Sequence, residues 1–173
     1  MYCKVNSCIQ SILPEKAHYF KEELLDDVLV VPSQKPDMER ILDIVAWAEV
    51  EDYKLIETEV GYSHEGQRLT GKKLVTEIKI KEKLTYVADV PEQSGHAAHY
   101  EKLKSIFVIL PEMVGDKYTC DLIRANRISI IPYVEDVCYR QLNEREIHRC
   151  LMLFVDVKLC WEGEWYKWHH VLI

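Results

Sequence analysis

The stretch Leu74–Tyr86, LVTEIKIKEKLTY, decides the fold because its apolar and charged residues alternate. The even positions are mostly apolar, namely Leu74, Thr76, Ile78, Ile80, Leu84 and Tyr86. Four of the odd positions are charged, namely Glu77, Lys79, Lys81 and Lys83. Only a β-strand places alternate residues on opposite faces. We therefore expect a long strand with one buried and one solvated face.

Two other stretches alternate in the same way. One holds Leu151, Leu153, Val155, Val157, Leu159 and Trp161, opposed by Asp156 and Lys158, and the other holds Leu42, Ile44, Ala46, Ala48 and Val50. Residues 106–110 and 128–134 are apolar on both faces, which predicts strands that are covered on both sides or meet a neighbouring subunit. Strands separated by Gly and Pro turns predict an all-β fold, a β-sandwich or jelly-roll-like domain.

Helix is expected only as short turns. Phe20, Leu24 and Val28 recur at every fourth residue, which predicts a helix within residues 15–28, although Val28 to Val31 looks extended. A single helical turn is expected over residues 37–42, because Pro36 suits a first helical position. Residues 143–150 are expected to add another short helix before the strand at Leu151.

The chain of 173 residues is 48% hydrophobic, which is enough for one domain with a real core. We expect an extended N-terminal arm over residues 1–20, a sandwich domain over 21–162 and an aromatic C-terminal segment over 163–173. The formal net charge is −7 and the basic residues are dispersed, which argues against a nucleic-acid partner. No apolar run approaches a signal peptide or the roughly 20 residues that span a bilayer, so no membrane partner is expected.

The motifs that carry catalysis in known enzymes do not occur in the sequence. It contains no GxSxG, Walker A, GxGxxG or HExxH pattern. His96 and His99 form an HxxH pair and His169 and His170 are adjacent, but His96 and His99 lack a cysteine at zinc-ligand spacing. We interpret these histidines as turn or strand-edge residues. We expect no enzymatic activity, no catalytic residue, no metal ligand and no cofactor.

The six cysteines are unevenly distributed and form no CxxC pair. One interpretation is that they are reduced core residues, which suits Cys138 and Cys150 and extends to Cys120. It suits Cys3 and Cys8 less well, because an arm outside the core has no interior in which to place a thiol. The second interpretation is that the arm reaches a neighbouring subunit and is locked there by disulfides. The candidates for these intersubunit bonds are Cys3, Cys8, Cys120 and Cys160.

The final residues, WEGEWYKWHHVLI, are too apolar to remain in water. We expect them to lie on their own core or on another subunit. The interface candidates are Trp161, Trp165, Trp168 and Ile173. An alternative is that these aromatic residues stack on sugars.

Three blocks of sequence, in order, resemble the SPOCS domain of spore-coat assembly proteins. The first is VPSQKPDMERIL (residues 31–42), the second RLTGKKLVTEIKIKEKLTYVAD (68–89), and the third HAAHYEKLKSIFVILPE (96–112). The resemblance covers roughly residues 28–160. It implies a strand that stops at Pro32, a turn at Lys35, Pro36 and Asp37, and a tight connection at Gly71. It also assigns His96 and His99 to the strand framework.

The resemblance implies a non-enzymatic protein of the spore coat, made in the cytoplasm of the mother cell and ending at the spore surface. The family's best-known member binds its ATPase partner through a C-terminal LysM domain, for which the residues up to Ile173 leave no room. We therefore expect a structural subunit that self-assembles into a surface layer or appendage fibre by donating its N-terminal arm as a strand. Its partners would be further copies of itself, other spore-coat proteins, or both. The alternatives are a non-polymerising protein-binding module and a sugar-binding or enzymatic sandwich.

Overall fold

The computed structural model describes residues 13–66 and 68–160. The elements in this part of the chain are the strands β1 (Tyr19–Val30), β2 (Met38–Glu57), β3 (Gly61–Tyr62), β4 (Arg68–Leu69), β5 (Lys72–Ala88), β6 (Gly95–Leu110), β7 (Met113–Val114), β8 (Lys117–Tyr118), β9 (Ile128–Gln141) and β10 (Glu146–Leu159), with the helix α1 (Thr119–Arg124).

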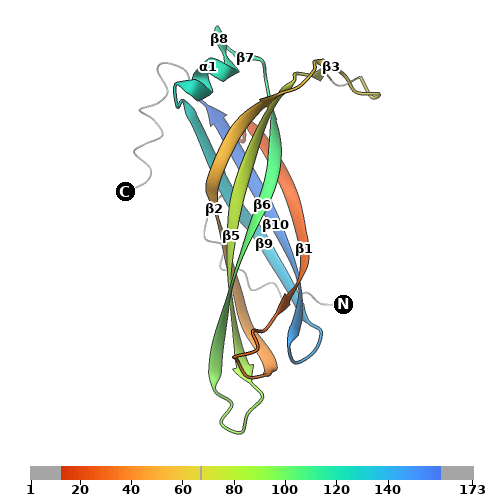
Figure 1. Cartoon of the computed structure of the whole chain (residues 1–173), viewed down its shortest axis with the longest axis vertical. Coiled ribbons are helices and arrows are strands. Elements are labelled where there is room, and N and C mark those ends of the chain that lie inside the picture. The colour runs from red at the N-terminus through yellow and green to blue at the C-terminus, as the bar shows by residue number, and fades with distance from the viewer. Residues whose placement is uncertain (1–12, 67, 161–173) are drawn as a thin grey trace.

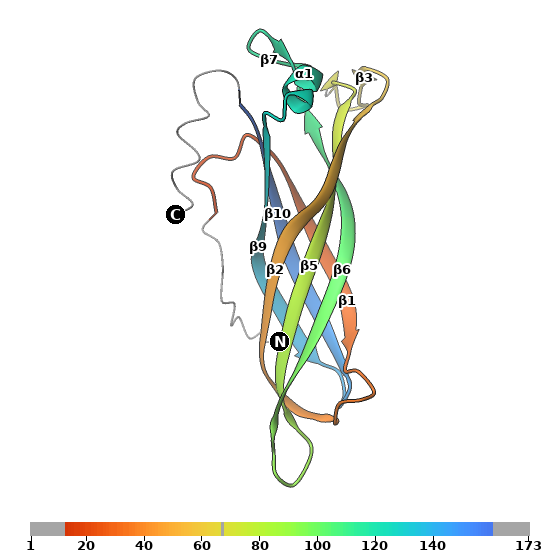
Figure 2. The same ribbon diagram turned by 60° about the vertical axis from the view of Figure 1, so that its left-hand side comes forward.

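Six long strands form two antiparallel sheets of three strands each, in the orders β1-β10-β9 and β2-β5-β6. The sheets pack face to face in an elongated sandwich, with α1 and the short strands at one end (Figures 1 and 2). The length follows from β2, which has 20 residues at about 3.3 Å each. The expected all-β, sandwich-like fold is confirmed.

The alternation along β5 has the predicted structural effect. Leu74, Ile78 and Leu84 are fully buried between the sheets. Lys79 and Lys81 point outward, and their ammonium groups lie 2.5 Å from the carboxylates of Glu51 and Glu49. The outer face of this sheet is therefore solvated and charged.

Strand β2 departs from the alternation predicted for it. Its register against β5 shifts three times, and one of the shifts lies between Ile41 and Asp43. A bulge of this kind changes which side chains face the core. Ile41 packs against the core whereas Leu42 is exposed, so the prediction that Leu42 shares a face with Ile44 is wrong.

The helix predicted within residues 15–28 is a strand, because β1 runs from Tyr19 to Val30. The spacing of Phe20, Leu24 and Val28 misled the prediction. Every fourth residue lies on one face of a strand as well as near one face of a helix. The prediction that Val28 to Val31 is extended was right as far as β1 continues.

The two other predicted helical turns are also absent from the described residues. Residues 38–42 already belong to β2. Residues 142–145 form a hairpin turn in which the Asn143 side-chain oxygen accepts bonds of 2.8 Å from the amides of Arg145 and Glu146. The helix that does form, α1, was not predicted.

Candidate functional site: the outer face of strand β1

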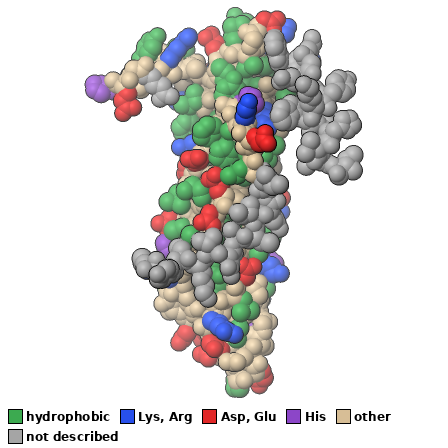
Figure 3. Space-filling model, turned by 180° about the vertical axis from the view of Figure 1, so that it is seen from behind, with side chains coloured by type: hydrophobic (Ala, Val, Ile, Leu, Met, Phe, Trp, Pro, Cys, Tyr) green, Lys and Arg blue, Asp and Glu red, His purple; other side chains and the backbone are tan. Residues whose placement is uncertain are grey.

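Strand β1 exposes a row of apolar side chains on the outer face of its sheet. Phe20, Leu24, Val28 and Val30 are 53%, 56%, 50% and 53% exposed. Figure 3, which views the molecule from the side of this sheet, shows hydrophobic side chains interspersed with carboxylates. We call these four residues the β1 row. Large apolar side chains gathered in this way are typical of surfaces that meet another molecule.

The β1 row lies against apolar side chains of the neighbouring strands. Leu24 lies directly opposite Met152 of β10. Phe20 stacks on Phe154 of β10 with 5.4 Å between ring centroids, and Tyr133 of β9 lies 6.1 Å from the same ring. These contacts join the three strands of the sheet, but Phe154 and Tyr133 are each only 8% exposed, so the exposed large apolar side chains of this sheet are those of β1.

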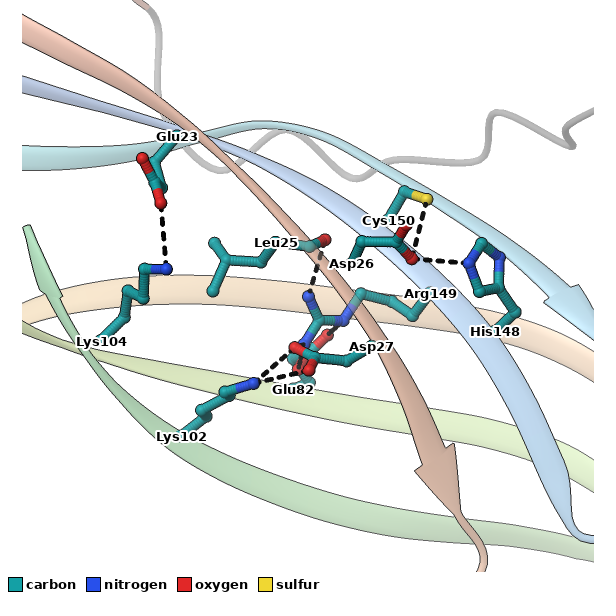
Figure 4. Close-up of polar contacts among 10 residues, drawn as sticks. All are labelled: Glu23, Leu25, Asp26, Asp27, Glu82, Lys102, Lys104, His148, Arg149 and Cys150. Atoms are coloured by element: carbon teal, nitrogen blue, oxygen red, sulfur yellow. Dashed lines mark hydrogen bonds and ion pairs between the residues drawn. The ribbon is translucent and has the colours of Figure 1, made fainter.

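Strand β1 is also an edge strand. In the described part of the chain its backbone pairs with β10 alone. Across the gap to β6 the two sheets are linked by side chains: Lys104 lies 2.9 Å from Glu23, and Lys102 lies 2.6 Å from Asp27 (Figure 4). The hydrogen bond from Lys102 holds the pKa of Asp27 below its ordinary value, although burial opposes this effect. Because β1 pairs, among the described strands, with β10 on one side only, the backbone N–H and C=O groups on its other side point away from the sheet.

Beneath this edge an ion pair joins the two sheets inside the core. Arg149 of β10 is fully buried and Glu82 of β5 is 2% exposed. Arg149 Nε lies 2.8 Å from Glu82 Oε1, and Nη2 donates to Oε2 at 3.0 Å. Arg149 also donates to the Leu25 carbonyl at 3.2 Å and to Asp27 at 3.3 Å. Burial raises the pKa of Glu82, and the Arg149 charge opposes that rise.

Sequence reasoning missed this ion pair although the signal was present. Glu82 falls in the inward phase of β5, and Arg149 falls in the inward phase of β10 between Ile147 and Leu151. A buried charge needs an opposite partner. Two inward charges of opposite sign on different strands therefore predict a pair.

A second polar cluster lies on the outer face and interrupts the β1 row, because Asp26 projects between Leu24 and Val28. His148 Nε2 lies 2.6 Å from Asp26 Oδ1, and the Cys150 thiol donates to the same oxygen at 3.7 Å (Figure 4). Among the described residues these three side chains form the group whose atoms could hold a metal ion.

Cys138 lies directly opposite Cys150 in the β9–β10 pairing. Both side chains are half-buried on the outer face. They are therefore not the core residues that the sequence predicted.

The residues of the KPD-type turn gather around Arg145. The guanidinium donates to the carbonyls of Val31 and Pro32 at 2.9 Å and pairs with the carboxylate of Asp37. The Lys35 amide donates to the Pro32 carbonyl at 2.9 Å, and Tyr86 donates to the Pro36 carbonyl at 3.0 Å. This turn is a structural element that ties β1, β2 and the β9–β10 hairpin together.

Gly71 provides the tight connection into β5. Its φ is +74°, and a Cβ there would lie 2.4 Å from the Thr58 carbonyl oxygen. The Thr58 amide donates to the Gly71 carbonyl at 2.8 Å. Both the backbone conformation and the close approach require glycine.

The remaining candidates are only partly described. Cys120 lies in α1 and Cys160 directly follows β10, and both are half-buried. His96 stacks on Tyr86, and His99 points outward from the same strand, so these two histidines lie on opposite faces of β6. The other candidates, Cys3, Cys8, Trp161, Trp165, Trp168 and Ile173, lie outside the described residues, as do His169 and His170.

A shallow pocket lies on the outer face of the other sheet. Its volume is about 140 Å³, and it is lined by Asp52, Tyr53, Lys54, Val75, Glu77 and Ser105.

No helix in the described ranges is long and apolar enough to cross a membrane. Comparison of the chain with protein-family models, with curated proteins and with solved structures finds no match.

Proposed function

We propose that this protein is a non-enzymatic structural subunit that self-assembles, and that the β1 row is the surface on which the next copy docks. The observation that carries the proposal is the combination of an edge strand with four half-exposed apolar side chains on one face. An added strand that pairs with the backbone of this edge would displace the Lys102–Asp27 and Lys104–Glu23 contacts, and its outer side chains would extend the apolar row.

The β1 row is better suited to this role than the exposed side chains of β6. Leu103 and Phe107 of β6 are also exposed, but Leu103 lies opposite Lys79, and the Lys73 ammonium lies 5.8 Å from the Phe107 ring. Burying either side chain in a dry contact would therefore remove a lysine from water. On the other sheet, Leu24 lies opposite Met152 and Phe20 stacks on Phe154, although the carboxylates of Glu22 and Asp26 project from the same face of β1.

Residues 1–12 are the donor strand in this proposal. Their sequence alternates Val5 and Ile9 with Lys4, Asn6 and Gln10, a pattern compatible with a strand that buries one face. Contacts that run head to tail in this way can continue as filaments. Cys3 and Cys8 would then be able to form disulfides with Cys120 or Cys160 of a neighbouring copy.

We propose the spore surface as the location of the protein, because three blocks of its sequence resemble the SPOCS domain. The turn around Arg145 and the connection at Gly71 give two of these blocks a structural role in the sandwich. A second candidate function, a binding module that docks on another coat protein without polymerising, uses the same exposed row.

The proposal is tested by comparing the mass and shape of purified variants. We expect the full chain to form fibres or sheets in negative-stain images and large species in light scattering. Leu24→Glu places a charge in the β1 row and should weaken association at least tenfold. Leu103→Glu is the matched control, because Leu103 is 57% exposed and lies on the other sheet.

Deleting residues 1–12 should give folded monomers, which circular dichroism would verify. If the unmodified chain is a monomer, self-assembly is excluded and only the second candidate function, the binding module, remains. Equal association of the Leu24→Glu and Leu103→Glu variants would exclude the β1 row as the contact. Non-reducing electrophoresis tests the disulfides: a single monomer band from oxidised assemblies would remove the four cysteines from the proposal.

A further inference from the structure

The outer face of the β1-β10-β9 sheet brings together three side chains of different ligand chemistry. They are the carboxylate of Asp26, the imidazole of His148 and the thiol of Cys150 (Figure 4). One donor atom from each residue lies within 4.8 Å of the other two. The Asp26 Oδ1 oxygen is central, since it lies 2.6 Å from His148 Nε2 and 3.7 Å from Cys150 Sγ.

The backbone fixes this arrangement. His148 and Cys150 are two residues apart on β10 and therefore point to the same face. Asp26 is the direct cross-strand partner of Cys150, and Val28 is that of His148. The three side chains thus project from neighbouring positions of a paired ladder, on strands that the packed core holds in register. Sites on rigid elements of this kind keep their geometry better than sites on loops.

The donor set matches zinc. Zn²⁺ is borderline-soft and is bound in proteins by cysteine sulfur, histidine nitrogen and carboxylate oxygen. In a tetrahedral site these donors stand roughly 3.3–3.6 Å apart, given metal–ligand bonds of about 2.0–2.3 Å. The 3.7 Å separation of sulfur and oxygen already fits. The 2.6 Å contact between Asp26 and His148 must open by less than about 1 Å, which a side-chain rotation supplies.

Solvent can reach the site. The Asp26 side chain is 58% exposed and that of His148 is 34% exposed. A metal ion can therefore enter without unfolding the sandwich. Three protein ligands leave the fourth tetrahedral position for water, as in zinc sites that are not fully enclosed.

We propose that Asp26, His148 and Cys150 form a binding site for Zn²⁺ or a divalent ion of the same ligand preference. Binding requires the Cys150 thiolate, so it releases a proton from that thiol. The sequence by itself predicts no metal ligand, because Asp26 lies 122 positions before His148 and 124 before Cys150. The pairing of β1 with β10 makes these residues neighbours. This inference does not depend on self-assembly.

The test is a titration of the full chain, kept reduced, with Co²⁺ as a spectroscopic substitute for Zn²⁺. We expect one equivalent to give a thiolate-to-cobalt charge-transfer band and the intense visible bands of tetrahedral Co²⁺, both removed by added Zn²⁺. Asp26→Asn, His148→Ala and Cys150→Ala should each weaken binding at least tenfold. Circular dichroism would show that the variants remain folded.

Two matched controls keep the result specific. Cys138→Ala removes the thiol opposite Cys150, and His99→Ala removes an exposed histidine on the other sheet. Both variants should bind as the unmodified chain does. A charge-transfer band that survives Cys150→Ala would place the metal on other thiols and overturn the proposal. A band that survives both Asp26→Asn and His148→Ala would do the same, because it would show binding to a lone thiolate.

Discussion

Arg149 and Glu82 join the two sheets of the sandwich through a buried contact, with 2.8 Å between Nε and Oε1. The arginine comes from β10 and the glutamate from β5. Neither side chain has appreciable contact with solvent, so each depends on the other to offset its desolvation.

Replacing Arg149 alone should destabilise the sandwich strongly. We expect Arg149→Met to lower the free energy of unfolding by about 3–5 kcal/mol, because it leaves Glu82 buried without its counter-charge. The double variant Arg149→Met, Glu82→Leu should recover most of the loss, since both charges are then replaced by apolar groups. Urea denaturation measures both values.

The matched control for this pair is the exposed contact beside it. Lys102→Met removes the partner of Asp27 at the rim and should cost at most about 1 kcal/mol. Equal losses from Arg149→Met and Lys102→Met would contradict the view that burial, rather than charge pairing as such, makes the inner pair important.

Tyr100 should make the protein sensitive to alkaline pH. Burial, followed by the nearby Tyr86 and Glu82 charges, raises the pKa of Tyr100 to about 12 from an ordinary value of 10.0. The unfolded chain therefore loses this proton first, and stability falls as the pH rises from 10 toward 12. The variant Tyr100→Phe should lose less stability over this range, as measured by urea denaturation at each pH.

At neutral pH the same substitution should be harmless or stabilising. Among the described residues the Tyr100 hydroxyl is buried without a hydrogen-bond partner, and removing such a group relieves its desolvation. Tyr62→Phe, at a side chain that is 75% exposed, is the control and should leave the pH dependence unchanged. A large loss of stability in Tyr100→Phe at pH 7 would show that the hydroxyl has a partner.

Gly71→Ala should destabilise the start of β5. The substitution forces a left-handed backbone on alanine and places a methyl group against the Thr58 carbonyl, so we expect a loss of about 2 kcal/mol or more. Gly61→Ala is the matched control, because a Cβ at Gly61 meets nothing within 4 Å. Thermal or urea unfolding of the two variants should therefore differ clearly. Similar unfolding of both would show that the chain between Thr58 and Gly71 shifts freely.

Arg145→Lys should loosen the turn over residues 31–37. Lysine keeps the charge but cannot reproduce the planar guanidinium that contacts Val31, Pro32 and Asp37 together. We expect a loss of about 1–3 kcal/mol and faster hydrogen exchange at the amides of Lys35 and Met38. Arg140→Lys, at an exposed position of β9, should change stability by less than about 0.5 kcal/mol. Unchanged exchange in Arg145→Lys would show that the backbone bonds hold the turn without the side chain.

The sequence predicted the strand character of the chain where polarity alternates strictly. In β5, Ile78 and Lys79 could be assigned to opposite faces with no knowledge of their neighbours, because backbone geometry alone sets that alternation. The sequence prediction failed for β1, because the spacing of Phe20, Leu24 and Val28 fits both a helix and a strand. The pairing of β1 with β10 resolved the ambiguity.

The sequence by itself determined that this is an all-β chain and which side chains of its most regular strands face inward. Tertiary structure alone decided which inward charges meet, as with Glu82 and Arg149, and which outward groups become neighbours, as with Asp26 and Cys150. The physical reason is range: side-chain direction is a local property of two successive residues, whereas strand order joins residues distant in sequence through the packing of the whole core.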